Sequence, residues 1–356
     1  MSVTQMTPFR QVLRAYSALL GIHDSLNKIA AAEKQPPAVI EINDRAWQGE
    51  FAALRDELNR SIAAIRAEAH GQQPVVAPHY LPRPPFFHPN GAGAFMQFSN
   101  CTAADFFHPR FQEIRGLISH WFTYHRKLWE WVFIIHHLIE SGEVKPGARG
   151  LVFGVGSERL PSLFAKMGAA IVATDAPAEI GAAAGWNETG QYSASLDGLW
   201  HEKVVDRQTF DRLVTYETCD MNAIPEHLRG FDFNWSSCCF EHLGDLEAGM
   251  QFVINAVEKT LRVGGIAVHT TEFNLSSNDG TVEQGHTVIY RRRDIEELIA
   301  RLRDRGHEVQ ELRIAPDAHP LEYYVDMPPY CQEPHLRLML GLYVATSVGI
   351  VVRRGR

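Results

Sequence analysis

The sequence has little of what marks a secreted or membrane-spanning protein. Its 356 residues include five cysteines, an odd number without a C-x-x-C pair, so no disulfide framework is indicated. The N-terminus shows no basic segment followed by an apolar one, and no apolar run reaches the length of a membrane span. These absences predict a cytoplasmic protein with no membrane span.

Positive charge is also scarce. The formal net charge is −8 at pH 7 and the sequence pI is about 6.1, whereas a general nucleic-acid binder presents a basic surface. The run Arg291–Arg293 is short and precedes acidic residues, which is typical of a solvated helix start. Hydrophobic residues make up 45% of the chain, enough for a sizeable core. We therefore expect a globular protein without a nucleic-acid partner.

Helical periodicity dominates residues 1–70. Phe51, Leu54, Leu58, Ile62 and Ile65 recur at steps of three and four. This stripe suits a helical N-terminal arm that joins two copies of the chain into a homo-oligomer. It suits equally a helix that packs on its own domain, and the pattern does not decide between them.

Three further segments complete the predicted domain organisation. Residues 71–92 carry prolines at 74, 78, 82, 84, 85 and 89, which predicts an extended linker. Residues 93–145 predict a helical subdomain with one long aromatic-rich block at about 106–141, which would cover a cofactor site. From residue 146 to 356, strand-like and helix-like runs alternate, which indicates an α/β domain. We expect strands at about 150–154, 170–174, 213–217, 231–237, 265–271, 308–314 and 343–353, and helices near 158–167, 245–261 and 291–305.

The stretch GLVFGVGSERLP, residues 150–161, predicts a strand, a glycine turn and a helix start. Gly154 and Gly156 allow a close approach of the backbone to a ligand, and the helix start offers free N–H groups. The third glycine of a dinucleotide loop is absent, because Arg159 stands in its place. Glu158 adds a carboxylate that repels a pyrophosphate and attracts a positively charged ligand. Both features favour S-adenosylmethionine (SAM), which carries a sulfonium and no phosphate, over NAD.

A second acidic residue lies 19 positions after Gly156. Asp175 ends the strand expected at 170–174, where a carboxylate accepts hydrogen bonds from ribose hydroxyls. NAD-binding folds share this feature. Further along, Asp220 lies in a short loop after the third strand and is a candidate for binding the adenine amino group.

The order of these motifs resembles that of class I SAM-dependent methyltransferases. The glycine loop is similar to the first motif of the family, Asp175 to its ribose acid and Asp220 to its adenine-loop acid. FDFNWSSCCFEHL (231–243) resembles the fourth-strand motif, and TLRVGG (260–265) resembles the turn before the fifth strand. The resemblance covers residues 146–356 and implies a Rossmann-like, seven-stranded sheet with an antiparallel closing pair. Two positions depart from the family pattern, because Glu158 replaces a glycine and Val152 replaces an acid.

The resemblance implies a set of cofactor contacts. Arg126, in the helical block before the first strand, is expected to pair with the SAM carboxylate. The other candidates line the predicted loops after the strands: Phe153, Gly154, Val155, Gly156, Glu158, Asp175, Ala176, Asp220, Met221, Asn222, Ser237, Cys238 and Glu241. Trp186 and Asn187 either cover the adenine or pack in their loop.

The segments HTTEFN (269–274), GHTVIYRRRDIEEL (285–298), GHEV (306–309) and TSVGIVV (346–352) narrow the resemblance. They are similar to methyltransferases of bacterial polysaccharide and surface-glycan synthesis. This likeness implies a small-molecule sugar or glycan hydroxyl as the methyl acceptor. Tyr323, Tyr324 and Asp326, in a tyrosine- and proline-rich stretch, and Asn274 are the candidates for binding it.

A hydroxyl acceptor needs a base, and histidine is the usual one near neutral pH. His286 and His242 are the preferred candidates, because His242 follows the fourth strand and His286 lies in the polar loop SSNDGTVEQGH. His269, Glu272 and Tyr290 are further catalytic candidates. Because His269 lies inside the expected fifth strand, a histidine in the core is the favoured interpretation if that face is buried. His269, Glu272, Asn274 and His286 also have the right side chains for a divalent metal site, but their spacing is not specific, and we expect no metal.

Two other functions remain open from the sequence. An NAD(P)-dependent oxidoreductase would share the glycine loop and Asp175. A non-catalytic assembly protein would use residues 1–70 to recruit partners and the SAM-binding domain as a scaffold.

Overall fold

The computed structural model describes residues 94–177, 196–330 and 333–356. The chain divides into two compact units, residues 1–75 and 76–356, and all the described residues belong to the second. The N-terminal arm at 1–70, the linker at 71–92, Trp186 and Asn187 therefore lie outside the described residues. Among the helices that are described, none combines the length and the apolar character needed to cross a membrane.

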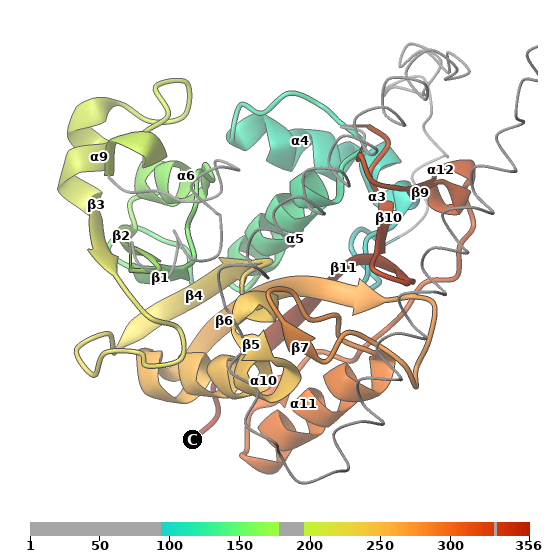
Figure 1. The fold of residues 1–356 in the computed structure, drawn as a ribbon. Helices are drawn as coiled ribbons and strands as arrows, with labels where there is room; N and C mark the ends of the chain where they lie inside the picture. Colours follow the sequence, from blue (N-terminus) through green and yellow to red (C-terminus); the bar gives the residue numbers. More distant parts are fainter. Residues whose placement is uncertain (1–93, 178–195, 331–332) are drawn as a thin grey trace, which may run out of the picture. The chain divides into compact units, whose positions relative to one another are not determined.

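A mostly parallel sheet forms the centre of the described unit (Figure 1). Its strand order is β3-β2-β1-β4-β6-β11-β10-β9, and β8 pairs with β11. The first five strands in this order are parallel to one another, while β11 runs antiparallel to β6. The strands are β1 (Arg149–Phe153), β2 (Ala170–Asp175), β3 (Val214–Thr218), β4 (Phe231–Ser237), β6 (Leu261–Asn274), β8 (Glu308–Val309), β9 (Val325–Asp326), β10 (Arg337–Leu340) and β11 (Tyr343–Arg353). A separate pair joins β5 (Gly244–Asp245) and β7 (Gln284–Gly285).

The expectation of a seven-stranded sheet is wrong, because the main sheet has nine strands. The two additional strands, β9 and β10, come from the stretch between the two closing strands, which the sequence suggested was a loop. β10 forms a hairpin with β11 across a turn at Gly341, whose φ is +58°, and β9 runs parallel to β10. The strand expected at 308–314 shrinks to β8, and the neighbouring stretch of the β11 edge is bonded to residues 99–101, with Asn100 opposite Val348.

Helices cover both faces of the sheet (Figure 1). The block expected as one helix at 106–141 is three: α3 (Ala103–Phe107), α4 (Pro109–Leu117) and α5 (Arg126–Glu140), the first break falling before Pro109. The others are α6 (Leu160–Lys166), η2 (Leu196–Leu199), α9 (Arg207–Leu213), η3 (Phe240–His242), α10 (Leu246–Asn255), the π turn η4 (Ala256–Thr260), α11 (Arg292–Asp304) and α12 (Pro320–Tyr323). The helix expected at 245–261 is thus divided into α10 and η4, and β6 begins at Leu261.

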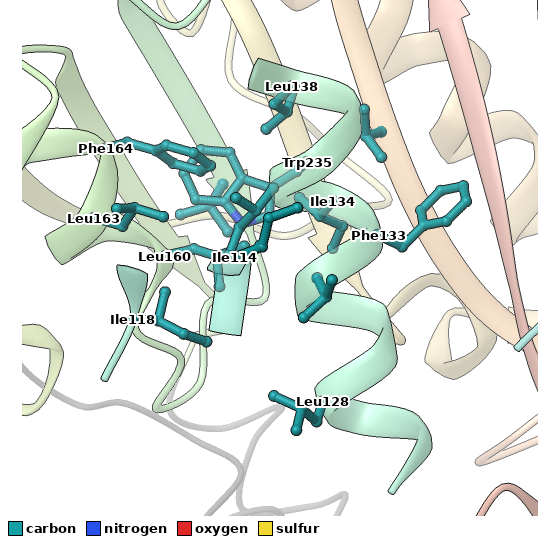
Figure 2. Close-up of a cluster of buried hydrophobic side chains, with 14 of the residues drawn as sticks. Ile114, Ile118, Leu128, Phe133, Ile134, Leu138, Leu160, Leu163, Phe164 and Trp235 are labelled. Atoms are coloured by element: carbon teal, nitrogen blue, oxygen red, sulfur yellow. The ribbon is translucent and has the colours of Figure 1, made fainter. Parts of the chain in front are cut away.

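Successive residues of the strands point into two different cores. Val152 of β1 and Trp235 of β4 pack with α4, α5 and α6, while Leu151 and Phe153 pack with α10 and α11 on the opposite face. This alternation follows from the two-residue period of a strand. Figure 2 shows Trp235 among side chains of α5 and α6, and the Phe164 ring meets it edge-on with 5.0 Å between centroids.

Helix α5 lies close against β11 because Gly349 has no side chain. A Cβ built on Gly349 would lie 2.1 Å from Cε1 of Phe133, a distance at which one of the two segments must move. Phe133 and its neighbours on α5 are fully buried, so the helix has little room to yield.

We expect Gly349→Ala to destabilise the protein by roughly 1–3 kcal/mol, the usual cost of overpacking a core. Gly116→Ala in α4 is the matched control, since no atom lies within 4 Å of the added methyl group; it should be neutral or slightly stabilising. Urea denaturation followed by circular dichroism measures both. Equal unfolding midpoints for the Gly349→Ala variant and the wild type would contradict this account of the helix–sheet contact.

Candidate active site

The sheet has a topological switch point between β1 and β4. From β1 the chain crosses to β2 on one side, while β4 lies on the other side of β1. In open α/β sheets, ligands bind beyond the carboxyl ends of the strands at such a point. The predicted cofactor residues follow β1, β2, β3 and β4 at this edge.

The glycine turn after β1 is bound to the acid that ends β2. Gly154 and Gly156 have positive φ values of +59° and +51°. Oδ2 of Asp175 accepts a hydrogen bond from the Gly156 N–H at 3.0 Å, and Oδ1 accepts from the Ala176 N–H at 2.8 Å. A Cβ on Gly154 would lie 2.6 Å from Sγ of Cys239, so only glycine fits there. The structure therefore brings the first two predicted motifs together.

The loop after β3 joins the same cluster. The Cys219 N–H donates to the Asp175 carbonyl at 2.8 Å, which places Asp220 beside the end of β2. Oδ1 of Asp220 accepts from the Asn222 N–H at 2.8 Å, so the aspartate shapes its own turn. Met221 is buried on the Gly154 side of this loop. Asp220, Met221 and Asn222 thus lie where the sequence predicted an adenine-binding loop.

Glu158 differs from its sequence-based description as a carboxylate exposed to a ligand. Its side chain is buried, and Oε1 accepts a hydrogen bond from the Trp235 indole N–H at 2.6 Å. Burial raises the pKa of Glu158 to about 8, although the Trp235 hydrogen bond and Lys127 act in the opposite direction. The group is mostly protonated at pH 7, so it does not by itself distinguish a cationic cofactor from an anionic one.

A buried charge network lies at the start of α5, over the ends of β4 and β11. The Glu130 carboxylate accepts hydrogen bonds from Arg126 at 3.2 Å, from Lys127 at 2.7 Å, and from the hydroxyls of Ser237 at 3.1 Å and Ser347 at 2.5 Å. Burial alone would raise the pKa of Glu130, but Lys127 and Arg126 outweigh it and hold the pKa near 2. Of this set, only Arg126 and Ser237 were predicted from the sequence. The spacing of Arg126, Lys127 and Glu130 on one helix was the available signal.

Arg126 also extends the network to the end of β6. Its guanidinium lies 2.5 Å from Oε1 of Glu272, while Oε2 of Glu272 and Oε1 of Glu241 are buried and have no hydrogen-bond partner among the described residues. The other Glu241 oxygen accepts from the Thr271 hydroxyl at 3.0 Å. Burial raises the pKa of Glu272 to about 7 against the effect of Arg126. Two buried carboxyl oxygens without a hydrogen-bond partner among the described residues therefore remain beside Cys238.

A metal ion has one candidate position within the described ranges. Ligand atoms of Cys238, Glu241 and Glu272 lie within 4.8 Å of one another. This set shares only Glu272 with the four residues that were considered from the sequence. Arg126 already supplies a positive charge to Glu272, which lowers the attraction of the cluster for a cation.

The predicted catalytic histidines do not lie together. His269 is fully buried in β6, where Nδ1 lies 2.8 Å from the Ser236 hydroxyl, and burial lowers its pKa to about 3. Nδ1 of His242 donates to the His286 carbonyl across 2.7 Å, while the His286 side chain itself is exposed. Tyr290 is buried and its hydroxyl donates to the Leu246 carbonyl at 3.3 Å. His269 and Tyr290 thus occupy the core, whereas His242 ends η3 and His286 follows β7.

The predicted acceptor-binding residues also differ in their surroundings. The Asn274 side chain donates to Gly280 and Thr281 and accepts from two backbone N–H groups, so its hydrogen bonds serve the loop at 275–281. Tyr323, the last residue of α12, and Tyr324, which follows it, are exposed. Asp326 is buried in β9, with Oδ2 lying 2.5 Å from Nδ1 of His335, a residue that the sequence analysis did not identify.

Comparison with known proteins gives likeness only at the level of solved structures. No protein-family model matches the sequence, and no curated protein matches it. A SAM-dependent methyltransferase from Clostridium acetobutylicum is 14% identical, with 65% of this chain and 92% of that chain covered and a TM-score of 0.35. The 1,6-didemethyltoxoflavin-N1-methyltransferase of Burkholderia thailandensis, solved with S-adenosylhomocysteine, is 15% identical, with 63% and 76% covered and a TM-score of 0.34. At this level of similarity, function has to be argued from the site.

The Glu158 carboxyl group predicts a pH-dependent stability difference. Between pH 4.5 and about 8 the folded chain keeps a proton on Glu158 that the unfolded chain loses, so this group makes the protein less stable as pH rises. Glu158→Gln keeps an acceptor for Trp235 and removes the titration. We expect the melting temperature of the variant relative to wild type to rise from pH 5 to pH 8.

Differential scanning calorimetry at several pH values measures this difference. Glu113→Gln, on the exposed face of α4, serves as the control and should give a flat profile. A profile for Glu158→Gln that is as flat as the control would show that Glu158 is ionised in the folded protein.

Proposed function

We propose that the protein is a SAM-dependent methyltransferase. The observation that carries the proposal is the hydrogen bond from the Gly156 N–H to Asp175 at the β1–β4 switch point. It sets a ribose-binding carboxylate beside a glycine turn, with the Asp220 loop next to both. This is an arrangement suited to an adenosine group.

The surroundings of the turn favour SAM over NAD(P). Arg159 stands at the place of the third dinucleotide glycine, and its guanidinium donates to the carbonyls of Ile118 at 3.2 Å and Ser119 at 2.8 Å. It is therefore directed toward the end of α4 instead of a pyrophosphate. The polar groups beyond β4 and β6 include the unpartnered oxygens of Glu241 and Glu272, which suit the positively charged and donor groups of a methionine-type cofactor or its acceptor.

For the acceptor, we propose a sugar or glycan hydroxyl and a histidine base. The support is the likeness of residues 269–274 and 285–298 to glycan methyltransferases, together with the exposed tyrosines near α12. Aromatic faces of this kind suit the apolar face of a sugar ring. His242 and His286 stay the candidate bases from the sequence.

Isothermal titration with SAM, S-adenosylhomocysteine and NADH tests the cofactor. We expect both sulfur compounds to bind and Asp175→Ala to weaken binding by about 10- to 150-fold, the value of a hydrogen bond to a charged group. Asp206→Ala is the matched control, because Asp206 also accepts from a backbone N–H but lies at the start of α9. Binding of NADH without binding of SAM would support the oxidoreductase instead.

Transfer of tritium from [methyl-³H]SAM tests the acceptor class. Methyl glycosides and UDP-sugars should become labelled in the presence of the wild-type protein. If SAM binds and these sugars stay unlabelled, the proposed acceptor class is wrong, although the protein binds the cofactor.

A further inference from the structure

Strand β9 and the residue that precedes β10 by two positions bring together a buried aspartate and a buried histidine. Oδ2 of Asp326 lies 2.5 Å from Nδ1 of His335. The two side chains are 1% and 7% exposed, so the contact is shielded from water. Both strands are additions to the seven that the sequence predicted, and neither residue has a place in the cofactor cluster at β1 and β2.

Three contacts fix His335 against the start of α5. Its N–H donates to the Tyr124 carbonyl at 2.7 Å, and its carbonyl accepts from the Arg126 N–H at 3.0 Å. Its ring stacks on that of His125, with 4.5 Å between centroids and an interplanar angle of 24°. The imidazole is thus held beside Arg126, whose guanidinium contacts Glu272 at the end of β6.

The hydrogen bond to Asp326 decides which ring nitrogen of His335 carries the proton. A carboxylate accepts, so in the neutral imidazole the proton lies on Nδ1 and the lone pair on Nε2. Nε2 is therefore the ring nitrogen that can accept a proton. Burial lowers the pKa of His335, which the Asp326 hydrogen bond opposes. The group is therefore in the form that accepts a proton at neutral pH.

We propose that His335, in place of His242 and His286, is the general base of methyl transfer and that Asp326 positions it. This inference rests on the proposed function. The acceptor O–H gives its proton to Nε2 of His335 while its oxygen forms the bond to the methyl carbon of SAM. The bond from that carbon to sulfur breaks, and its electron pair stays on sulfur, which becomes a neutral thioether. Asp326 stabilises the imidazolium that results, as a carboxylate does in a catalytic triad.

The alternative role is a structural latch, in which the Asp326–His335 pair only fastens β9 and β10 to α5. The two roles differ in what the imidazole does, not in where it lies. A base needs a reactive Nε2 and affects the rate of the chemical step. A latch affects folding and binding and has no need for a free Nε2.

Modification by diethyl pyrocarbonate tests Nε2 without knowledge of the acceptor. The reagent acylates neutral, accessible imidazole nitrogens, and peptide mass spectrometry locates the product. Exposed His286 is the positive control and buried His269 the negative control. We expect His335 to be modified in the folded protein at pH 7. If His335 stays as unmodified as His269, the inference is overturned.

Substitution tests the chemical step. With the sugars that the wild type labels from [methyl-³H]SAM, His335→Gln should lower kcat by about 10²- to 10⁴-fold, the usual contribution of a general base. KM and the affinity for S-adenosylhomocysteine should stay within about twofold. His307→Gln is the matched control, because His307 is also buried and hydrogen-bonded, but to Gly355 beyond α11. Wild-type kcat in His335→Gln, or a loss confined to KM and melting temperature, would assign the latch.

Asp326→Asn separates positioning from structure. The charged and titratable groups around His335 are Asp326 on β9, Tyr330 in the following loop, and His125, Arg126 and Glu130 at α5. Removing the Asp326 charge should lower the apparent pKa on the acidic limb of the kcat profile and lower its plateau. An unchanged profile would exclude the positioning role. If the wild type transfers no tritium to any sugar, the proposed acceptor class fails, and the modification result decides the state of Nε2 on its own.

Discussion

The carboxylate of Glu130 is the interaction around which the candidate site is built. It has no exposed surface and is bonded to two cations on its own helix and to hydroxyls of β4 and β11. An unpaired charge in such a place would be very unfavourable, and breaking a buried pair of this kind costs about 3–5 kcal/mol. The network therefore holds the start of α5 at the carboxyl edge of the sheet. Through Arg126 it also sets the position of Glu272.

Burial and pairing have opposite effects on the carboxyl groups of this region. Glu130 has two cations within 3.2 Å and its pKa falls to about 2. Among the described residues, the Trp235 indole is the one close hydrogen-bond donor to the Glu158 side chain, and the pKa of Glu158 rises to about 8. The pKa of Glu272 lies between those of Glu130 and Glu158, because the single guanidinium of Arg126 only partly offsets the effect of burial. One small region thus contains an ionised, a protonated and an intermediate carboxyl group at neutral pH.

The parallel strands could be predicted from the sequence because each is a short apolar run with a glycine or acidic turn after it. β1, β2, β3 and β4 begin and end within about a residue of the expected positions, and the meeting of Gly156 and Asp175 follows from the parallel arrangement. β9 and β10 were missed because they are two and four residues long in a stretch rich in proline. The role proposed for the His335 side chain depends on its contacts with Asp326 and His125. Sequence periodicity does not indicate these contacts.

The contact between Gly349 and Phe133 bears on the site although it carries no polar group. Gly349 lies two residues after Ser347 on β11, and Phe133 lies three residues after Glu130 on α5. Helix α5 and strand β11 are therefore in contact at two places, one apolar and one charged. Two contacts one helical turn apart define both the height and the tilt of a helix above a sheet. A methyl group added at Gly349 would tilt α5 about its charged end. The alignment of Arg126 with Glu272 therefore depends on the absence of a side chain at Gly349, deep in the apolar core.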